Sequence, residues 1–396
     1  MKSADARRAR IVLCVQNLPV PDDPRVWREA RDLAAAGYDV SVVCPRRSNQ
    51  SARERLQNVE ILRYRPGPAF DGVIGQLTET ATALLATAWK VVRLQAKGRI
   101  DVLHAANPPD TFFLVGLLLR PFGTRFVFDQ HDVSPELMNA KLGSRPLLER
   151  VMRLFERGSY RSAHLVIAPN HSYRDLALGR GGKRPEDVVV VRSGPDEVTP
   201  ADRIDLPTPA VLAFAGAMDS QDGVHLLIEA AAEILGRRPD AVRVELIGKG
   251  DNVDALRALA RERGVDEAVT FVDWLQRPEL HRRLLGATIA VSPDPDNAFT
   301  RVSTMTKVTD YLGLGLPCVV ADLPENRATG DDAVMYFEAG NAHDLARAVE
   351  QLIDDPGLHA DYAARARERA PALLWAHSRD RLLTAYDALL SGSNAA

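Results

Sequence analysis

The stretch that decides the fold is IAVSPDPDNAFTRVSTMTKVTDYLGLGLPCVVAD, residues 289–322. Its pattern predicts a buried strand, a polar loop, a helix over 303–314 that opens on Ser303 and Thr304, a glycine-proline turn and a second strand. In an open α/β sheet, ligands bind in the loops at the carboxyl ends of strands. Free N–H groups at the helix start can face an anion, and Lys307 and Asp310 lie one turn apart on that helix. The segment therefore predicts a nucleotide-diphosphate site, with a cation for phosphate and a carboxylate for ribose.

The remainder of the chain repeats this alternation of strands and helices. Short, nearly continuous β-branched runs alternate with helical patterns in two series, as in parallel sheets buried on both faces. At 396 residues, the chain is too long for one ordinary core. We therefore predict an α/β protein with two Rossmann-like domains of similar size, residues 1–195 and 196–372, followed by a C-terminal helical segment, residues 373–396.

Composition excludes several functional classes. The formal net charge of -3 disfavours a protein that binds nucleic acid by bulk phosphate neutralisation. Cys14, Cys44 and Cys318 lie in or beside apolar strand-like runs without CxxC spacing, which predicts buried, reduced thiols. The amino-terminal residues lack the apolar region of a secretory signal, and no run approaches about 20 apolar residues, so a cytoplasmic protein is expected. The segment 73–97 predicts an amphipathic helix that covers a sheet, with peripheral membrane docking as the alternative.

Two common nucleotide motifs are missing. No GxGxxG follows the first strand, where the sequence reads QNLPVPDDPR (16–25), so a dehydrogenase is disfavoured. Residues 179–184 lack the Ser or Thr of a P-loop and no strand precedes them. Asp294-Pro-Asp296 has the Asp-x-Asp form of some metal sites, but a proline-spaced pair in a turn is more often turn chemistry, so no metal is expected.

Other loops offer candidate ligand contacts. In AFAGAMDSQDGVHLLIEA (213–230), Gly216 ends a strand and Gly223 opens a helix, and a second glycine loop contains Gly248 and Lys249. In FDQHDVSPELM (128–138), His131 follows a strand directly and would project from the carboxyl edge of the sheet.

The start of the first helix offers a further candidate group. Asp23 is expected to cap this helix, with Pro24 at its first position. Arg25 and Arg28 are then expected at a cleft rim.

Taken together, these segments resemble the GT-B fold, retaining glycosyltransferases of family 4 type, the bacterial glycosyltransferase group 1, over nearly the whole chain. The resemblance lies in DPRVWREARDLAAAGYDVSVVCP (23–45), FDQHDVSPELM (128–138), APNHSYRDLALGRGG (168–182), VVRSGPD (190–196), SQDGVHLLIEA (220–230) and STMTKVTDYLGLGLPCVVADLPENR (303–327). It implies two facing domains, with the donor in the C-terminal one, the acceptor mainly in the N-terminal one, and metal-independent chemistry in the cleft between them. It also implies that the final helix crosses back to the first domain.

The resemblance implies roles for particular residues. The catalytic set would be His131, at the donor sugar, Lys307, at the diphosphate, and Asp310, at the ribose. Further donor contacts would come from the glycine loops and the start of the 303–314 helix: Gly216, Met218, Gly223, Gly248, Lys249, Arg301, Ser303, Thr304, Met305 and Thr306. The acceptor side would comprise Asp23, Arg25, Asp132 and Glu136. No metal and no other cofactor are expected.

Some family positions are altered. Ala217 and Asp222 stand where the family often has Arg and Lys, and Val302 stands in the first of two glutamate positions, of which Asp310 fills the second. The run Thr300-Arg301-Val302 therefore suggests either an unusual donor, contacted by Arg301, or lost activity. The expected function is transfer of a sugar from a UDP- or GDP-linked donor to an acceptor that the sequence does not identify, in glycan, glycolipid or natural-product assembly. A nucleotide-binding pseudo-enzyme and a sugar-nucleotide epimerase of the same fold are the alternatives.

Overall fold

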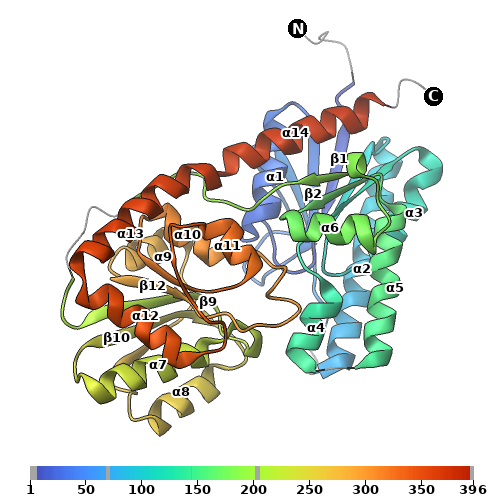
Figure 1. Cartoon of the computed structure of the whole chain (residues 1–396). Helices are drawn as coiled ribbons and strands as arrows, with labels where there is room; N and C mark the ends of the chain where they lie inside the picture. Colours follow the sequence, from blue (N-terminus) through green and yellow to red (C-terminus); the bar gives the residue numbers. More distant parts are fainter. Residues whose placement is uncertain (1–6, 68–71, 144, 201–205, 393–396) are drawn as a thin grey trace. The chain divides into compact units, whose positions relative to one another are not determined.

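The computed structural model describes residues 7–67, 72–143, 145–200 and 206–392. By contacts between residues, the chain divides into two compact units. The first comprises described residues up to 138, residues 145–192 and residues from 378 onward, and the second comprises residues 139–143 and the described part of 193–377. Each unit is built on one predominantly parallel sheet with helices, so the predicted α/β class is confirmed (Figure 1).

The first unit contains an eight-stranded sheet in the order β3-β4-β2-β1-β5-β6-β7-β8, parallel except for the β3–β4 pair. Its central strands are buried on both faces; in β1, for example, Ile11, Val12 and Leu13 are fully buried. The strand order reverses direction at β1, which pairs with β2 on one side and β5 on the other. In open α/β sheets, ligands bind beyond the strand ends at such a switch point. The strands are β1 (Arg10–Cys14), β2 (Asp39–Pro45), β3 (Arg53–Leu56), β4 (Val59–Tyr64), β5 (Val102–Ala106), β6 (Arg125–Asp129), β7 (Leu165–Ala168) and β8 (Val188–Val190).

Helices alternate with the strands of this sheet along the chain. Their bounds are α1 (Pro24–Ala35), α2 (Gly72–Lys97), α3 (Phe113–Leu119), α4 (Ser134–Leu142), α5 (Pro146–Ser162) and α6 (His171–Gly179), with short 3-10 turns η1 (Arg120–Phe122) and η2 (Pro185–Asp187). None of the helices in the described ranges is long and apolar enough to span a membrane. The last helix, α14 (Trp375–Ser391), ends in this unit, where Leu382 and Tyr386 are fully buried.

The second unit contains a six-stranded parallel sheet in the order β11-β10-β9-β12-β13-β14. Here the order reverses at β9, which pairs with β10 and β12. Its strands are β9 (Ala210–Ala217), β10 (Val242–Lys249), β11 (Val269–Val272), β12 (Ile289–Ser292), β13 (Cys318–Ala321) and β14 (Met335–Phe337). Its helices are α7 (Val224–Arg237), α8 (Val253–Glu262), α9 (Arg277–Leu284), α10 (Thr306–Gly313), α11 (Pro324–Gly330), α12 (Ala342–Asp354) and α13 (Pro356–Arg369), with turns η3 (Ser220–Asp222) and η4 (Ala370–Leu373).

Sequence patterns missed β3, α4 and α11. Strand β3, RERL, has no apolar run because it is an exposed edge strand that pairs antiparallel with β4. The intervening Gln57 and Asn58 both adopt positive φ, 46° and 66°, a conformation typical of tight hairpin turns. Helices α4 and α11 are short, at nine and seven residues, so their apolar periodicity is too brief to stand out.

Candidate active site

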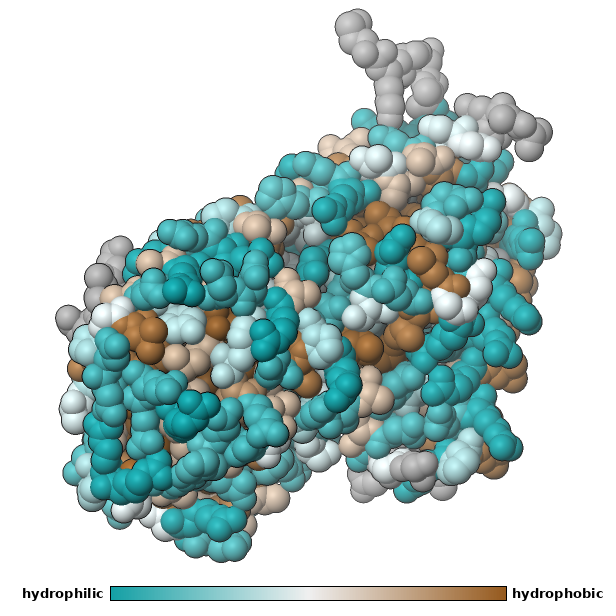
Figure 2. Space-filling model, in the orientation of Figure 1, coloured by the Kyte–Doolittle hydropathy of each residue, from teal (hydrophilic) through white to brown (hydrophobic). Residues whose placement is uncertain are grey.

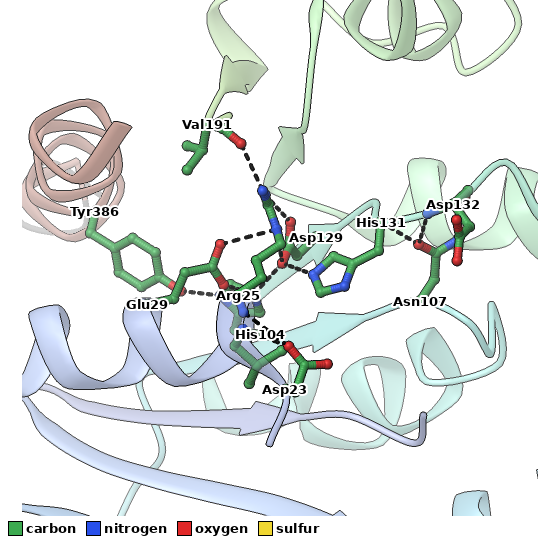
Figure 3. Close-up of polar contacts among 11 residues, drawn as sticks. Asp23, Arg25, Glu29, His104, Asn107, Asp129, His131, Asp132, Val191 and Tyr386 are labelled. Carbon is green, nitrogen blue, oxygen red and sulfur yellow. Dashed lines mark hydrogen bonds and ion pairs between the residues drawn. The ribbon is translucent and has the colours of Figure 1, made fainter. Parts of the chain in front are cut away.

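His131 lies just beyond strand β6 and is held by two buried residues of the first unit. Its Nε2 is 2.5 Å from Oδ2 of Asp129, the last residue of β6 (Figure 3). The backbone N–H of His131 donates to Oδ1 of Asn107 at 2.6 Å, and that oxygen also accepts from the N–H of Asp132 at 3.1 Å. The imidazole and its loop therefore have a defined orientation at the carboxyl edge of the sheet, as the sequence predicted.

Arg25 is buried rather than placed at a rim. Asp23 caps α1 by accepting from the N–H groups of Arg25 and Val26, with Pro24 at the first helical position, which confirms the predicted cap. The guanidinium of Arg25 donates to Oδ1 of Asp129 at 2.8 Å and to the carbonyl of Val191 at 2.8 Å (Figure 3). Arg25 and Arg28 are 7% and 6% exposed, so the predicted rim position is wrong for both. For Arg25 the reason is that Asp129, fully buried at the end of β6, requires a counter-ion, whereas Arg28 donates to the carbonyl of Pro24 in its own helix at 3.0 Å.

Glu29, His104 and Tyr386 complete this buried cluster. Glu29 Oε1 is 3.4 Å from Nε of Arg25, and His104 Nε2 is 3.4 Å from a carboxylate oxygen of both Glu29 and Asp129. On its other side, His104 Nδ1 is 2.7 Å from the hydroxyl of Tyr386 in α14 (Figure 3). Strands β1, β5 and β6 are adjacent, so this cluster lies at and beside the switch point of the sheet.

Two carboxyl groups in the cluster share one permanent cation. Burial, followed by the charge of Asp129, raises the pKa of Glu29 well above its ordinary value. Burial also acts to raise the pKa of Asp129, but the charges of Arg25 and His131 and hydrogen bonds from His104 and His131 hold it well below its usual range. Burial lowers the pKa of His104. These directions favour an ionised Asp129 beside Arg25, with Glu29 protonated and His104 neutral.

Glu29, His104 and Asp129 also form a set of possible metal ligands, since one ligand atom from each lies within 4.8 Å of the others. The position is already occupied by a cation of the chain, because Arg25 contacts both carboxyl groups. A metal ion would also need Glu29 ionised, against the direction of its pKa. These residues do not fit a resident metal.

The other residues predicted on the acceptor side have defined partners. The carbonyl of Asp132 accepts from Nδ2 of Asn107 at 2.8 Å. Glu136, in α4, accepts two hydrogen bonds from Arg180, at 2.6 and 3.2 Å. Arg180 also donates to the buried Glu156 at 2.5 Å. Glu136 is therefore part of an ion-pair group that ties α4 to α5 and α6.

In the second unit, the loops that follow β9 and β12 pack directly on each other. Gly223, at φ 67°, precedes α7, and a Cβ there would lie 2.1 Å from the carbonyl oxygen of Pro293. Gly248, at φ 140°, is the second-to-last residue of β10, and a Cβ there would lie 1.9 Å from the carbonyl oxygen of Gly216. Met218 is buried, and its N–H donates to the carbonyl of Lys249 at 3.0 Å. These glycines are thus explained by loop packing at the switch point of the second sheet.

Lys307 lies against this pair of loops. Its Nζ is 2.6 Å from Oδ1 of Asp294, and their side chains are 10% and 1% exposed. The same ammonium lies 5.0 Å from the ring centroid of Phe214, and its Cε would be 3.6 Å from a Cβ at Gly216. Asp294 accepts a further hydrogen bond from Ser292 at 2.5 Å. The predicted cation is therefore at the switch point, with a buried carboxylate as its partner.

The neighbouring charged residues form separate ion pairs. Asp310 accepts from Arg277 of α9 at 2.7 Å, so Asp310 and Lys307 contact different partners. Arg301, at 60% exposed, pairs with Asp296 on the same loop at 2.5 Å. Asp294 and Asp296 therefore each hold a different cation of the chain rather than forming a joint metal site. Lys249 is exposed, with its ammonium 6.0 Å from the ring centroid of Trp274.

The predicted start of the 303–314 helix is wrong. Helix α10 begins at Thr306, and Met305 occupies the cap position without a side-chain cap bond. Asn297 explains the delay, because its Oδ1 accepts from the N–H groups of Phe299 and Thr300 and closes a separate turn. Ser303 and Thr304 therefore lie before the helix. The N–H of Ser303 donates to the carbonyl of Phe299 at 3.1 Å, and the hydroxyl of Thr304 donates to Glu325 at 3.4 Å. The N–H of Val308 donates to the carbonyl of Met305 at 3.0 Å, and the N–H groups of Thr306 and Lys307 come before any acceptor within the helix.

The raised pKa of Asp222 predicts that the affinity for anionic ligands depends on pH. Burial raises the pKa of Asp222 to about 6, and the charge of Lys307 acts in the opposite direction. An anion bound at Lys307 would be repelled by ionised Asp222 above about pH 6, and below this pH the repulsion would be lost. We expect a nucleotide-diphosphate sugar, the ligand class that the sequence predicts, to bind more tightly as the pH falls from 8 to 5, because its phosphates do not titrate near pH 6. In Asp222→Asn, binding measured by calorimetry should lose most of this dependence; an unchanged profile would contradict it.

Sequence reasoning missed Glu29, His104, Asp129, Asn107 and Tyr386 as parts of the candidate site. One signal was present, since Asp129 and His131 are two residues apart at a strand end, a spacing that can place both on one face. Another was His104 inside the otherwise apolar strand VLHAA.

Comparisons with known proteins show the family of the chain. Residues 23–194 match the model of a glycosyl transferase 4-like domain, and residues 209–355 match the model of glycosyl transferases group 1. The chain belongs to the group 1 glycosyltransferases of family 4 type. This glycosyltransferase is 29% identical to a D-inositol 3-phosphate glycosyltransferase of Corynebacterium aurimucosum over 91% of this chain and 89% of the relative. A protein of the same name from Stackebrandtia nassauensis is 25% identical over 91% of this chain and 85% of the relative.

Solved structures show the GT-B fold. The glycosyltransferase superposes on sucrose-phosphate synthase from Thermosynechococcus elongatus with a TM-score of 0.80, at 18% identity, covering 97% of this chain and all of the other. It superposes on Anabaena Alr3699/HepE in complex with UDP-glucose with a TM-score of 0.72, at 17% identity, covering 96% of this chain and 99% of the other. The predicted fold is therefore confirmed.

Proposed function

We propose that this glycosyltransferase is a retaining, metal-independent hexosyltransferase that uses a UDP- or GDP-linked sugar in glycan, glycolipid or natural-product assembly. The observation that carries the proposal is the position of Lys307 beside Gly216, where the β9 and β12 loops meet. Cations and free helix N–H groups at such a switch point suit a diphosphate. The UDP-glucose complex of the structurally similar Anabaena protein supports a UDP-linked donor as the first choice.

In the proposed reaction, the bond between the sugar's anomeric carbon and the diphosphate oxygen breaks as the acceptor oxygen bonds to the same carbon on the same face. The acceptor's proton passes to the departing phosphate. Lys307 and the first N–H groups of α10 stabilise the negative charge that develops on the diphosphate. His131, held by Asp129, contacts the sugar near the reacting carbon, and Asp310 binds ribose, exchanging its ion pair with Arg277 for that contact.

The proposal includes metal independence because the two carboxylates of the Asp-x-Asp sequence already have side-chain cations as partners. Asp294 is paired with Lys307, and Asp296 with Arg301, so neither carboxylate is prepared for a divalent ion. Because sugar nucleotides are cytoplasmic metabolites, the proposal also places the enzyme in the cytoplasm. Transfer should then continue at full rate in a chelator.

The test is a thermal-shift screen of UDP, GDP, dTDP and ADP followed by transfer assays with the matching sugar nucleotides. Stabilisation reports occupancy of the folded state, so the true donor nucleotide should raise Tm most. D-inositol 3-phosphate should be one of the acceptors tested, because the relatives are named D-inositol 3-phosphate glycosyltransferases. Retention is checked by NMR of the product's anomeric configuration, and an inverted product would contradict the proposal. Nucleotide binding without turnover would favour the pseudo-enzyme, and sugar-nucleotide conversion without acceptor would favour the epimerase.

A further inference from the structure

Most of the exposed large apolar side chains in the described part of the chain lie on four neighbouring elements of the first unit. Of thirteen such residues, four are on α2, three on α3, one on η1 and three on α5. Leu147, Leu85 and Leu154 are 76%, 70% and 66% exposed. Contiguous apolar patches of this kind are uncommon on monomeric soluble proteins and mark interaction surfaces. Figure 2 shows apolar patches along the edge of the molecule where Figure 1 places α5.

These elements form one continuous surface, here named the α2–α3–α5 face. Helix α3 packs against both α2 and α5. The ring centroids of Phe113 and Phe155 are 6.4 Å apart, and a Cβ at Gly158 would lie 2.6 Å from the Phe113 ring, so α5 approaches α3 closely. At the other end, Arg99 just after α2 donates to the carbonyl of Gly123 just after η1 at 3.3 Å.

The exposed apolar residues follow helical spacing, so they are organised rather than scattered. Leu85, Trp89 and Val92 lie at i, i+4 and i+7 of one exposed stripe on α2, although the helix already buries Val91 and Leu94 on another side. Helix α5 repeats the same i, i+4, i+7 spacing in its exposed residues. A helix that packs only on its own sheet needs one apolar stripe. The second stripe predicts a second apolar partner.

Charge on this face identifies the chemistry of that partner. Helices α2, α3 and α5 with η1 contain eight Lys or Arg and three Glu, a net charge of +5, in a chain whose net charge is -3. Two of the three acids are already engaged, since Glu156 is buried against Arg180 and Glu149 pairs with Arg153. Exposed Arg150 and Arg157 remain beside the apolar stripe of α5. On α2, the guanidinium of Arg93 lies 4.1 Å from the ring centroid of Trp89.

We propose that the α2–α3–α5 face docks on the surface of an anionic phospholipid bilayer. Leu, Phe and Trp side chains enter the boundary between head groups and acyl chains, while Lys and Arg bind lipid phosphates. A second copy of the chain fits less well, because two faces of net charge +5 would repel each other. An acidic protein would satisfy the charge but would need its own extended apolar surface. This inference is independent of the proposed function, because it concerns binding to lipid and not turnover.

The test is co-sedimentation of the full chain with vesicles of phosphatidylcholine alone or mixed with phosphatidylglycerol. The wild type should bind the mixed vesicles, and binding should weaken when salt rises from about 0.1 M to about 1 M. Each basic residue near an anionic surface contributes roughly 1 kcal/mol, so Arg150→Glu with Arg157→Glu should reduce partitioning at least about tenfold. Trp89→Ser with Leu154→Ser should reduce it similarly by removing apolar contact.

Matched controls use the same residue types in the second unit. Trp274 is also exposed, so Trp274→Ser and Arg261→Glu should leave vesicle binding unchanged. All variants should keep the wild-type Tm, since the substituted side chains are on the surface. Absence of binding to anionic vesicles, or equal losses in the controls, would overturn the proposal. So would a dimer in lipid-free solution that the α2–α3–α5 substitutions dissociate, because the face would then join two copies of the chain.

Discussion

Replacing Lys307 with Ala is expected to lower kcat/KM by at least about a hundredfold and to weaken binding of the donor nucleotide. Loss of one donor that stabilises developing negative charge typically costs a factor of about 100 to 1,000 in rate. Lys307 is the cation that the structure places at the switch point of the second sheet, beside Gly216. Steady-state kinetics and calorimetric titration with the nucleotide measure the two effects separately. An unchanged kcat/KM would contradict the assignment of the donor site.

This experiment needs a control for folding, because Lys307 also compensates a buried charge. Asp294 is 1% exposed, so Lys307→Ala alone leaves an unpaired carboxylate whose cost is about 3–5 kcal/mol. The double variant Lys307→Ala with Asp294→Asn removes that charge and should recover most of the lost stability. If Lys307 acts on the donor, the double variant stays inactive despite its recovered Tm. Recovery of activity together with Tm would mean that the lysine only supports the fold.

The sequence predicted the order of strand, loop, helix and strand in residues 289–322 well because its signals are local. Strand β12, the polar loop and Lys307 lie within about 20 residues, and each is specified by its own apolar or turn pattern. The start of α10 was wrong for an equally local reason: Asn297 closes a turn that delays the helix to Thr306. A turn closed by one side chain several residues before a helix is not visible in apolar periodicity, so the sequence pattern does not fix where the helix begins.

The buried cluster in the first unit could not be predicted in the same way. His104 and Tyr386 are in contact although 282 residues separate them, and Arg25 meets Asp129 across 104 residues. These contacts depend on the strand order β1-β5-β6 and on the end of α14, not on any pattern within one segment. The predicted rim position of Arg25 failed for this reason. The Arg25–Glu29 spacing, i to i+4 on one helix, was a further local signal.

Isosteric substitution of the two buried carboxyl groups of that cluster is expected to change stability by very different amounts. Burial and the charge of Asp129 keep Glu29 protonated, so Glu29→Gln replaces one neutral group by another and should change the free energy of unfolding by less than about 1.5 kcal/mol. Asp129→Asn removes the ionised partner of Arg25, whose guanidinium is also buried, and should cost about 3–5 kcal/mol. Urea unfolding of the two variants measures this difference directly.

Asp129→Asn should also lower activity in molecules that remain folded, because Asp129 orients His131 through the 2.5 Å contact to Nε2. We expect kcat to fall about a hundredfold, the typical cost of mispositioning a group at the reacting centre, while nucleotide affinity stays near the wild type. Glu29→Gln is the matched control, since Glu29 is not in contact with His131 and should retain kcat. The double variant tests the same assignment. In Asp129→Asn the residue at position 129 is neutral, so the charge of Arg25 favours ionisation of Glu29. Adding Glu29→Gln then removes this new ion pair and should lower the free energy of unfolding further. If both single variants behave alike in stability and kcat, the assignment of one ionised and one protonated carboxyl group is wrong.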